Sequence, residues 1–167
     1  MVIIGNVVAF VASIFMVSAG ILKKKKKILL CQCIELSLYT VSNIILGGIA
    51  GAIINFLGVI ENVLGYKDKL NTIAKIILTI LSIILVLLFN NLGLIGYLPL
   101  ICMVIYLWIL DIKDVFKYKS FILIIMVFWF IYDFSIKSYV ASTFDILTII
   151  STIISMISIK KGKKSKK

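Results

Sequence analysis

Long apolar stretches, separated by lysines and turn residues, run through this chain from end to end. Most of them reach the roughly 17 to 25 residues that a helix needs to cross a bilayer. With 62% hydrophobic residues in 167, a soluble domain of this size could not cover its apolar surface, which excludes a soluble enzyme. The sequence predicts an all-α integral membrane protein with seven transmembrane helices, at residues 2–22, 28–47, 49–66, 71–89, 93–110, 120–136 and 138–159.

The boundary between the second and third segments depends on glycines. Gly47, Gly48 and Gly51 interrupt what would otherwise be one long apolar run. Glycines this dense favour a tight reversal between two helices, because glycine adopts backbone conformations that other residues avoid. The alternative is a single broken helix, which would leave six spans.

The lysines predict the orientation of the chain. Five lysines at 23–27 follow the first segment, whereas a signal peptide carries its basic residues before the apolar stretch. With seven helices and the N-terminus outside, 17 of the 18 lysines lie on the cytoplasmic side and only Lys137 lies outside. Six helices would put Lys67 and Lys69 outside. We therefore expect the C-terminus and its basic tail, 160–167, in the cytoplasm.

Seven helices can also divide into two parallel three-helix repeats joined by a linker helix. The repeats would be residues 1–66 and 93–159, with 71–89 as the linker. An offset of 90 residues superimposes polar and aromatic positions of the two repeats: Tyr39 and Trp129, Asn43 and Asp133, Asn55 and Asp145.

Three stretches carry a family resemblance. They are Tyr39-Thr-Val-Ser-Asn43, Leu46-Gly47-Gly48-Ile-Ala-Gly51-Ala52 and Phe128-Trp129-Phe130-Ile-Tyr132-Asp133. Together with the helix count and length, they resemble the YgjV family of small bacterial inner-membrane proteins. That family looks distantly similar to the SWEET, SemiSWEET and PQ-loop transporters, which are built from three-helix repeats.

The resemblance implies a location in the bacterial inner membrane and a 3+1+3 arrangement of helices. It also implies that the first, third and second helices pack in that order around a central substrate path. SWEET-type repeats carry hinge prolines and often a Pro-Gln pair, whereas this chain has only Pro99, followed by Leu100. This departure counts against sugar specificity and proline-hinged rocking.

Polar residues within the apolar segments are the candidates for function, because a charged side chain at mid-bilayer costs about 2.5–3.5 kcal/mol on insertion scales. Asn43, Asn55, Asp133 and Asp145 are the candidates for lining a substrate path, with Asn55 and Asp145 near its centre. Asp145 and Glu35 are also candidate proton sites. A carboxyl and an amide in one path suit a polar solute or a proton.

These candidates also have structural interpretations. Asn side chains can bond helices to one another. Asp133 is four residues before Lys137 and can form an ion pair with it at the end of a helix. Glu35 can bond a neighbouring helix or approach Lys27 near the interface.

Aromatic residues beside these positions have two interpretations as well. Tyr39 and Trp129 can stack on a ring of the substrate and belong to the pathway. Aromatic side chains also form belts at both membrane interfaces, and this interpretation extends to Tyr132 and Tyr106. Glu61, near the cytoplasmic end of the third helix, is expected to reach the headgroups beside the lysines that follow it.

The sequence offers nothing for catalysis, a cofactor or a metal. It has no histidine, no P-loop and no dinucleotide-binding glycine pattern. Cys31, Cys33 and Cys102 lack metal-ligand spacing and are expected to be small buried side chains.

The expected partners follow from the charge distribution. Lysines in short blocks, without arginine, suit anionic lipid headgroups better than nucleic acid. The predicted function is transport of a small polar solute by alternating access, as a uniporter or coupled to protons. The alternative is a membrane scaffold or lipid-interacting assembly protein that transports nothing, and homo-oligomerisation stays open under both.

Overall fold

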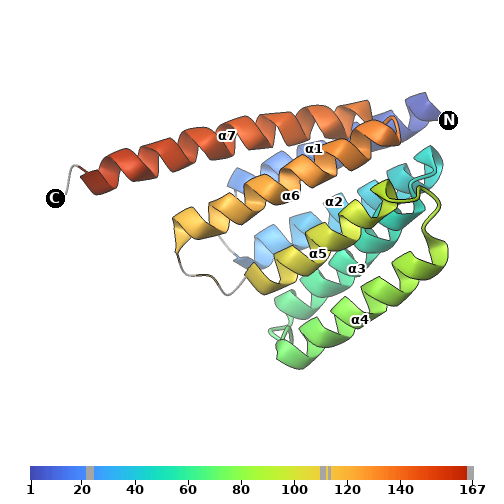
Figure 1. The fold of residues 1–167 in the computed structure, drawn as a ribbon, viewed down its shortest axis with the longest axis horizontal. Coiled ribbons are helices and arrows are strands. Elements are labelled where there is room, and N and C mark those ends of the chain that lie inside the picture. Colours follow the sequence, from blue (N-terminus) through green and yellow to red (C-terminus); the bar gives the residue numbers. More distant parts are fainter. Residues whose placement is uncertain (22–24, 110–111, 113, 165–167) are drawn as a thin grey trace.

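The computed structural model describes residues 1–167 apart from 22–24, 110–111, 113 and 165–167, and the described chain is entirely helical (Figure 1). The predicted number of helices is confirmed. They are α1 (Val2–Ile21), α2 (Lys25–Leu46), α3 (Ile49–Tyr66), α4 (Thr72–Phe89), α5 (Leu98–Ile109), α6 (Val115–Ser135) and α7 (Tyr139–Lys164), with a 3-10 turn, η1 (Ile95–Tyr97), before α5.

Five helices, α1 to α4 and α6, are long and apolar enough to cross a membrane over their described residues. The apolar part of α7, Tyr139–Ile154, is shorter, and so is Ile95–Ile109, which contains η1 and α5. Pro99 lies in the first turn of α5, where its missing N–H breaks no hydrogen bond of the helix. The coarse prediction of a multi-span helical protein is therefore confirmed.

Polar residues mark where two helices begin. The side chain of Asn71 accepts a hydrogen bond of 2.9 Å from the N–H of Ala74 and caps α4. Asp114 caps α6 in the same way, by accepting from Lys117 at 2.9 Å. This cap explains why α6 begins five residues before the predicted apolar segment at 120–136.

Six helices form a ring in the order α1, α2, α3, α5, α6 and α7, and α4 packs outside it against α3 and α5. Among α1, α2 and α3 the middle helix in space is α2, and among α5, α6 and α7 it is α6. The order first, third, second that the resemblance implied is therefore wrong for the described residues. Both orders place α3 beside α2. They differ in the neighbour of α1, which packs here against α2, the next helix along the chain, as consecutive elements usually do.

The α2–α3 connection is a tight reversal, as predicted, so the single broken helix is wrong. Gly47 has a φ of 79°, which glycine adopts without strain. The N–H of Gly48 donates to the carbonyl of Asn43 at 2.8 Å, and the N–H of Gly47 donates to that of Ile44 at 3.1 Å. These two bonds form the Schellman motif that commonly ends helices.

The α6–α7 connection repeats this turn 90 residues later. Lys137 has a φ of 63° at the position that matches Gly47. The N–H of Ser138 donates to the carbonyl of Asp133 at 2.8 Å, and that of Lys137 to Phe134 at 3.1 Å. Both turns lie at the same end of the bundle as the start of α1, and we call this end the turn end.

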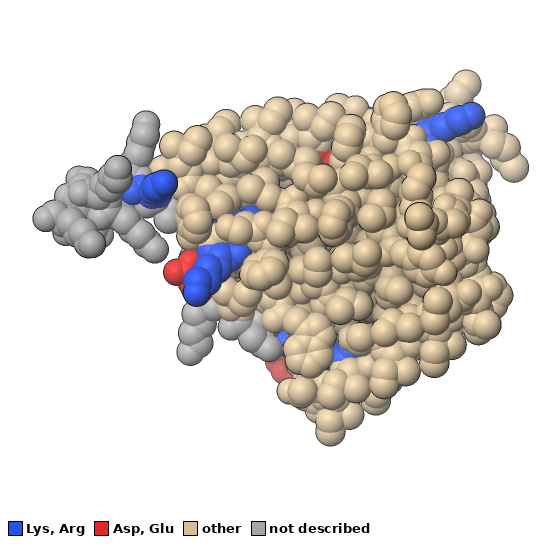
Figure 2. All heavy atoms as spheres, viewed as in Figure 1, with Lys and Arg blue, Asp and Glu red and all other residues tan. Residues whose placement is uncertain are grey.

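Large hydrophobic side chains are exposed along the helices, and on the face in Figure 2 the charged residues gather toward the ends, apart from one small acidic spot near the middle. Lys137 lies at the turn end, while the lysines at the start of α2 and α6 and in α7 lie at the other. At that other end, which we call the lysine end, Lys26 pairs with Asp68 at 3.8 Å across exposed surface. An apolar girdle between charged ends suits a bilayer.

Candidate functional site

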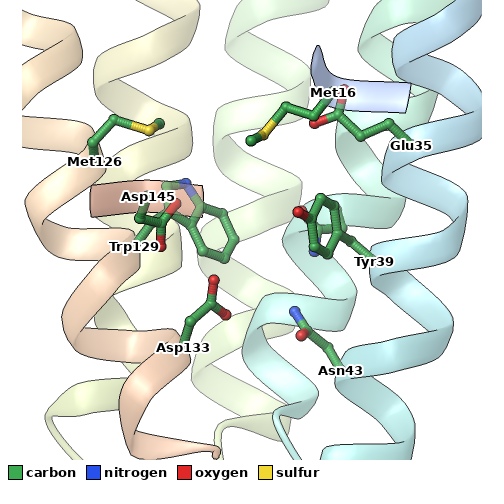
Figure 3. Close-up of a pocket in the computed structure, with 9 residues that line it drawn as sticks. Met16, Glu35, Tyr39, Asn43, Met126, Trp129, Asp133 and Asp145 are labelled. Carbon is green, nitrogen blue, oxygen red and sulfur yellow. The ribbon is translucent and has the colours of Figure 1, made fainter. Parts of the chain in front are cut away.

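A polar cavity of about 90 Å³ lies inside the ring of helices (Figure 3). Helices α2, α3, α6 and α7 supply its polar lining, and Met16 and Met126 add apolar surface. The structure brings together there all seven residues singled out for a pathway or a proton site: Glu35, Tyr39, Asn43, Asn55, Trp129, Asp133 and Asp145.

Two aspartates form the acidic side of this cavity. Asp133 and Asp145 are 6% and 7% exposed, and their carboxyl groups lie within hydrogen-bonding reach of each other. Oδ2 of Asp145 has no hydrogen-bond partner in the described part of the chain. No ion pair joins Asp133 to Lys137 there, since Lys137 is exposed in the turn. The predicted helix-end pair is therefore wrong.

Asn43 lies opposite, on α2. It is 1% exposed, and Figure 3 shows its amide and the carboxyl of Asp133 pointing toward each other. Oδ1 of Asn43 also has no partner among the described residues. Asn55 of α3 is buried and completes the amide side of the lining. A buried polar atom without a partner costs about 1–3 kcal/mol, so such atoms mark places where a ligand or water can bind.

The aromatic residues lie inside the bundle. Tyr39 bonds through its hydroxyl to Oγ of Ser13 at 2.8 Å. Trp129 packs edge-on against Tyr132, with ring centroids 5.8 Å apart. Tyr132 is 0% exposed, so its assignment to an interfacial belt is wrong. Tyr39 and Trp129 likewise face the cavity, and an aromatic ring there is available for stacking.

Tyr132 of α6 also caps α3, across the interior of the bundle. The N–H of Gly51, one of the first-turn donors that an α-helix leaves unpaired, donates to the hydroxyl of Tyr132 at 2.7 Å. A Cβ atom on Gly51 would lie 2.5 Å from the Tyr132 ring, and one on Gly48 would lie 2.5 Å from its hydroxyl. These glycines are therefore needed for close approach of the Tyr132 side chain as well as for the turn.

Two asparagines that the sequence analysis missed close the turn end. Asn6 of α1 donates to the carbonyl of Lys137 at 2.8 Å and accepts from the N–H of Val140 at 3.0 Å. Asn91, before α5, donates to the carbonyl of Gly47 at 2.8 Å. Gly47 and Lys137 are the matching turn positions. An asparagine from the α4–α5 connection bonds to the first turn, and an asparagine from α1 bonds to the second.

A second cavity, of about 180 Å³, continues from the first toward the lysine end, and the two share Glu35, Met126 and Trp129. Tyr106 lines it, which corrects its assignment to the belt. Glu61 also lines it, is 5% exposed and lies close to the ammonium of Lys75 on α4. The expectation that Glu61 reaches the headgroups is therefore wrong.

The three cysteines are free thiols, and Cys102 is buried while Cys31 and Cys33 are half-buried. Their thiols lie near backbone carbonyls of neighbouring helices, for example Cys31 near that of Phe15 at 3.3 Å. They do not line the first cavity.

Residues 3–163 match the family Imp-YgjV, described as a bacterial inner membrane protein. This chain belongs to the YgjV family. The match covers all seven helices, and the YgjV-family protein is accordingly a multi-pass protein of the bacterial inner membrane. The comparison with curated proteins and the comparison with solved structures gave no match.

Proposed function

We propose that this YgjV-family protein transports a small polar solute across the inner membrane by alternating access. The observation that carries the proposal is the buried cavity, in which Asn43 and Asp145 present acceptor atoms without partners. In a scaffold, buried polar side chains would be expected to satisfy one another across helix interfaces. Here they surround a space instead.

The moving parts would be two three-helix groups, α1–α3 and α5–α7, with α4 as the linker of a 3+1+3 fold. Three observations support this division. The turns at Gly47 and Lys137 have the same hydrogen bonds, 90 residues apart. The groups meet at two seams, α1 with α7 and α3 with α5, as a twofold axis through the ring requires. The cavity lies between them and takes matching residues from both.

The lysine distribution supports placing the turn end outside and the lysine end in the cytoplasm. In this orientation the N-terminus is outside and the C-terminus inside. The bonds from Tyr132, Asn6 and Asn91 would then form the outer barrier, and the second cavity would be the start of an inward path. Transport would require these bonds between the groups to break while an inner barrier forms.

A carboxyl group in such a site can also carry a proton. Asp145 and Glu35 line the first cavity from opposite groups, and Glu35 lies where the two cavities join. A proton on either would change the charge of the path as the solute passes, which is the basis of coupled transport. Uniport remains the simpler form of the proposal.

Cysteine labelling tests for a hydrophilic path without knowledge of the solute. In a variant with Cys31, Cys33 and Cys102 replaced by alanine, single cysteines are placed at Asn55 and Phe56. Asn55 lines the cavity, whereas Phe56 is 56% exposed on the apolar outer surface. We expect a charged thiol reagent to label position 55 in membranes and to leave position 56 unlabelled.

Positions 55 and 56 make the test strict, because the two variants place a single cysteine at adjacent positions of one helix. Folding is checked by the elution of each variant from a sizing column in detergent. Absence of labelling at position 55 in a folded variant would contradict a water-accessible path and favour the scaffold.

A further inference from the structure

We propose that the solute is a small organic cation, such as a primary ammonium, held between the Asp133–Asp145 pair and the rings of Trp129 and Tyr39. This inference rests on the proposed transport function and adds the chemical class of the solute. Hydrogen bonding, charge and shape of the cavity support it separately.

The hydrogen-bonding argument comes from the two atoms without partners. Oδ2 of Asp145 and Oδ1 of Asn43 are both acceptors, and both side chains are more than nine-tenths buried. A ligand that satisfies them must donate hydrogen bonds. An ammonium group is a donor with no acceptor capacity, and it can serve a carboxylate and an amide oxygen together.

The charge argument comes from what faces the site. Glu35, Asp133 and Asp145 line the first cavity, and no lysine lines either cavity in the part of the chain that the structure describes. The ammonium of Lys75 on α4 lies close to Glu61, which lines the second cavity. A hydrogen bond between the carboxyl groups of Asp133 and Asp145 needs one proton, which leaves one negative charge on the pair for a monovalent cation to balance. An anionic solute would add to that negative charge.

The shape and chemistry of the walls favour an organic cation over a metal ion. Trp129 and Tyr39 face the same space, and the face of an aromatic ring attracts a cation through its negative electrostatic potential. Met16 and Met126 offer apolar surface to a short carbon chain. Among the described residues no three Asp, Glu, Cys or His side chains are grouped as metal ligands.

Matched pairs of probes test the inference on the full-length protein in detergent. Each pair contains an amine that is protonated at pH 7 and a neutral analogue of similar size: ethanolamine with ethylene glycol, and benzylamine with benzyl alcohol. Titration calorimetry measures binding of each. We expect the ammonium compounds to bind at least tenfold more tightly than their neutral partners, because only they satisfy the acidic pair.

Variants locate the binding. Asp145→Asn and Asp133→Asn should each weaken ammonium binding at least tenfold, and Asp145→Glu should restore part of it. Asp68→Asn is the matched control, since it removes the same charge from an exposed position at the lysine end. The comparison of charged and neutral probes uses the unmodified chain, so it tests the inference even if a variant fails to fold.

Three results would overturn the inference. Equal or tighter binding of the neutral probes would exclude an organic cation as solute, while labelling at position 55 would leave the transport proposal standing. Absence of binding by every ammonium probe would also exclude it, and the labelling result would again decide separately whether a path exists. Ammonium binding that is unchanged in both aspartate variants would place the cation elsewhere.

Discussion

At the scale of single residues, the two matching turns place different residues in the same backbone conformation. Gly47 adopts a positive φ at little cost, whereas a non-glycine residue there pays about 1–2 kcal/mol. Lys137 therefore carries strain that Gly47 avoids. Its polar, exposed side chain suits the membrane surface, which explains why a lysine is tolerated at this position.

Reciprocal substitutions at these turns should have opposite effects. We expect Lys137→Gly to raise the free energy of unfolding in detergent micelles by about 0.5–1 kcal/mol, since the strain is relieved. Gly47→Ala should lower it by about 1–2 kcal/mol, and only through the backbone, because a Cβ there meets no atom within 4 Å. A loss of stability in Lys137→Gly would show that the lysine side chain has a role that the turn geometry does not explain.

The residue scale also shows what the sequence could predict about the site. Asn43, Asn55, Asp133 and Asp145 stood out because polar residues are rare in apolar segments, and they meet in one cavity. Tyr132 and Tyr106 were assigned to a belt because an aromatic residue has the same sequence signature at the rim and inside. Only the arrangement of the helices around the cavity brings the Tyr132 side chain to the N–H of Gly51.

At the scale of helices, the apolar runs predicted the number of helices, and five of them are long enough to match a bilayer. The fifth was predicted at 93–110, whereas α5 is Leu98–Ile109 and follows the turn η1. The ends of the helices were less predictable where lysines flank an apolar run, because the apolar run stops there while the helix can continue through the lysines. Lysine is a good helix former, so α2 begins at Lys25 and α7 continues to Lys164, outside the apolar runs. The neighbours of each helix could not be predicted from its own sequence, and the ring order differs from the expected one for that reason.

The contact of α3 with Tyr132 of α6 can be tested by substitutions that each add or remove one small group. Tyr132→Phe keeps the ring and removes the bond to Gly51, and we expect a loss of about 1 kcal/mol in the free energy of unfolding. Gly51→Ala should cost more, about 1–3 kcal/mol, because its Cβ overlaps Tyr132 and Asn43. Gly65→Ala, on the same helix, meets Leu29 only at 3.5 Å and should be neutral or stabilising.

These three variants are compared by thermal unfolding of the purified proteins. A Gly65→Ala variant that loses as much stability as Gly51→Ala would mean that α3 tolerates no added methyl group anywhere. The contact with α6 would then not be the cause.

At the scale of the whole molecule, each three-helix group caps a helix of the other. Tyr132 of α6 caps α3, and Asn6 of α1 caps α7 by accepting from Val140. Asn91 adds a bond from before α5 to the α2–α3 turn. The turn end is therefore closed by bonds between the groups, which is what an outer barrier in alternating access requires.

Removal of the three bonds that Asn6 and Asn91 make across the turn end should loosen this barrier. In Asn6→Ala with Asn91→Ala, we expect a membrane-impermeant reagent added outside to label a cysteine at position 55 several-fold faster. Each bond is worth about 1 kcal/mol, or roughly fivefold in population. Ser135→Ala is the control, since Ser135 lies near the same end and bonds only within α6, to Ile131. Unchanged rates in the double variant would contradict a gating role for these bonds.

The bond between Asn6 and Lys137 also bears on how the protein is made. Its partners lie 131 residues apart, so the first turn of the first helix leaves the ribosome long before its acceptor exists. At roughly 5–20 residues per second, that interval is of the order of ten seconds. Until α7 arrives, the amide of Asn6 has a partner in its own helix, the carbonyl of Val2 at 2.9 Å. The seam between α1 and α7 cannot close before α7 is made, and a chain truncated before α7 would lack it.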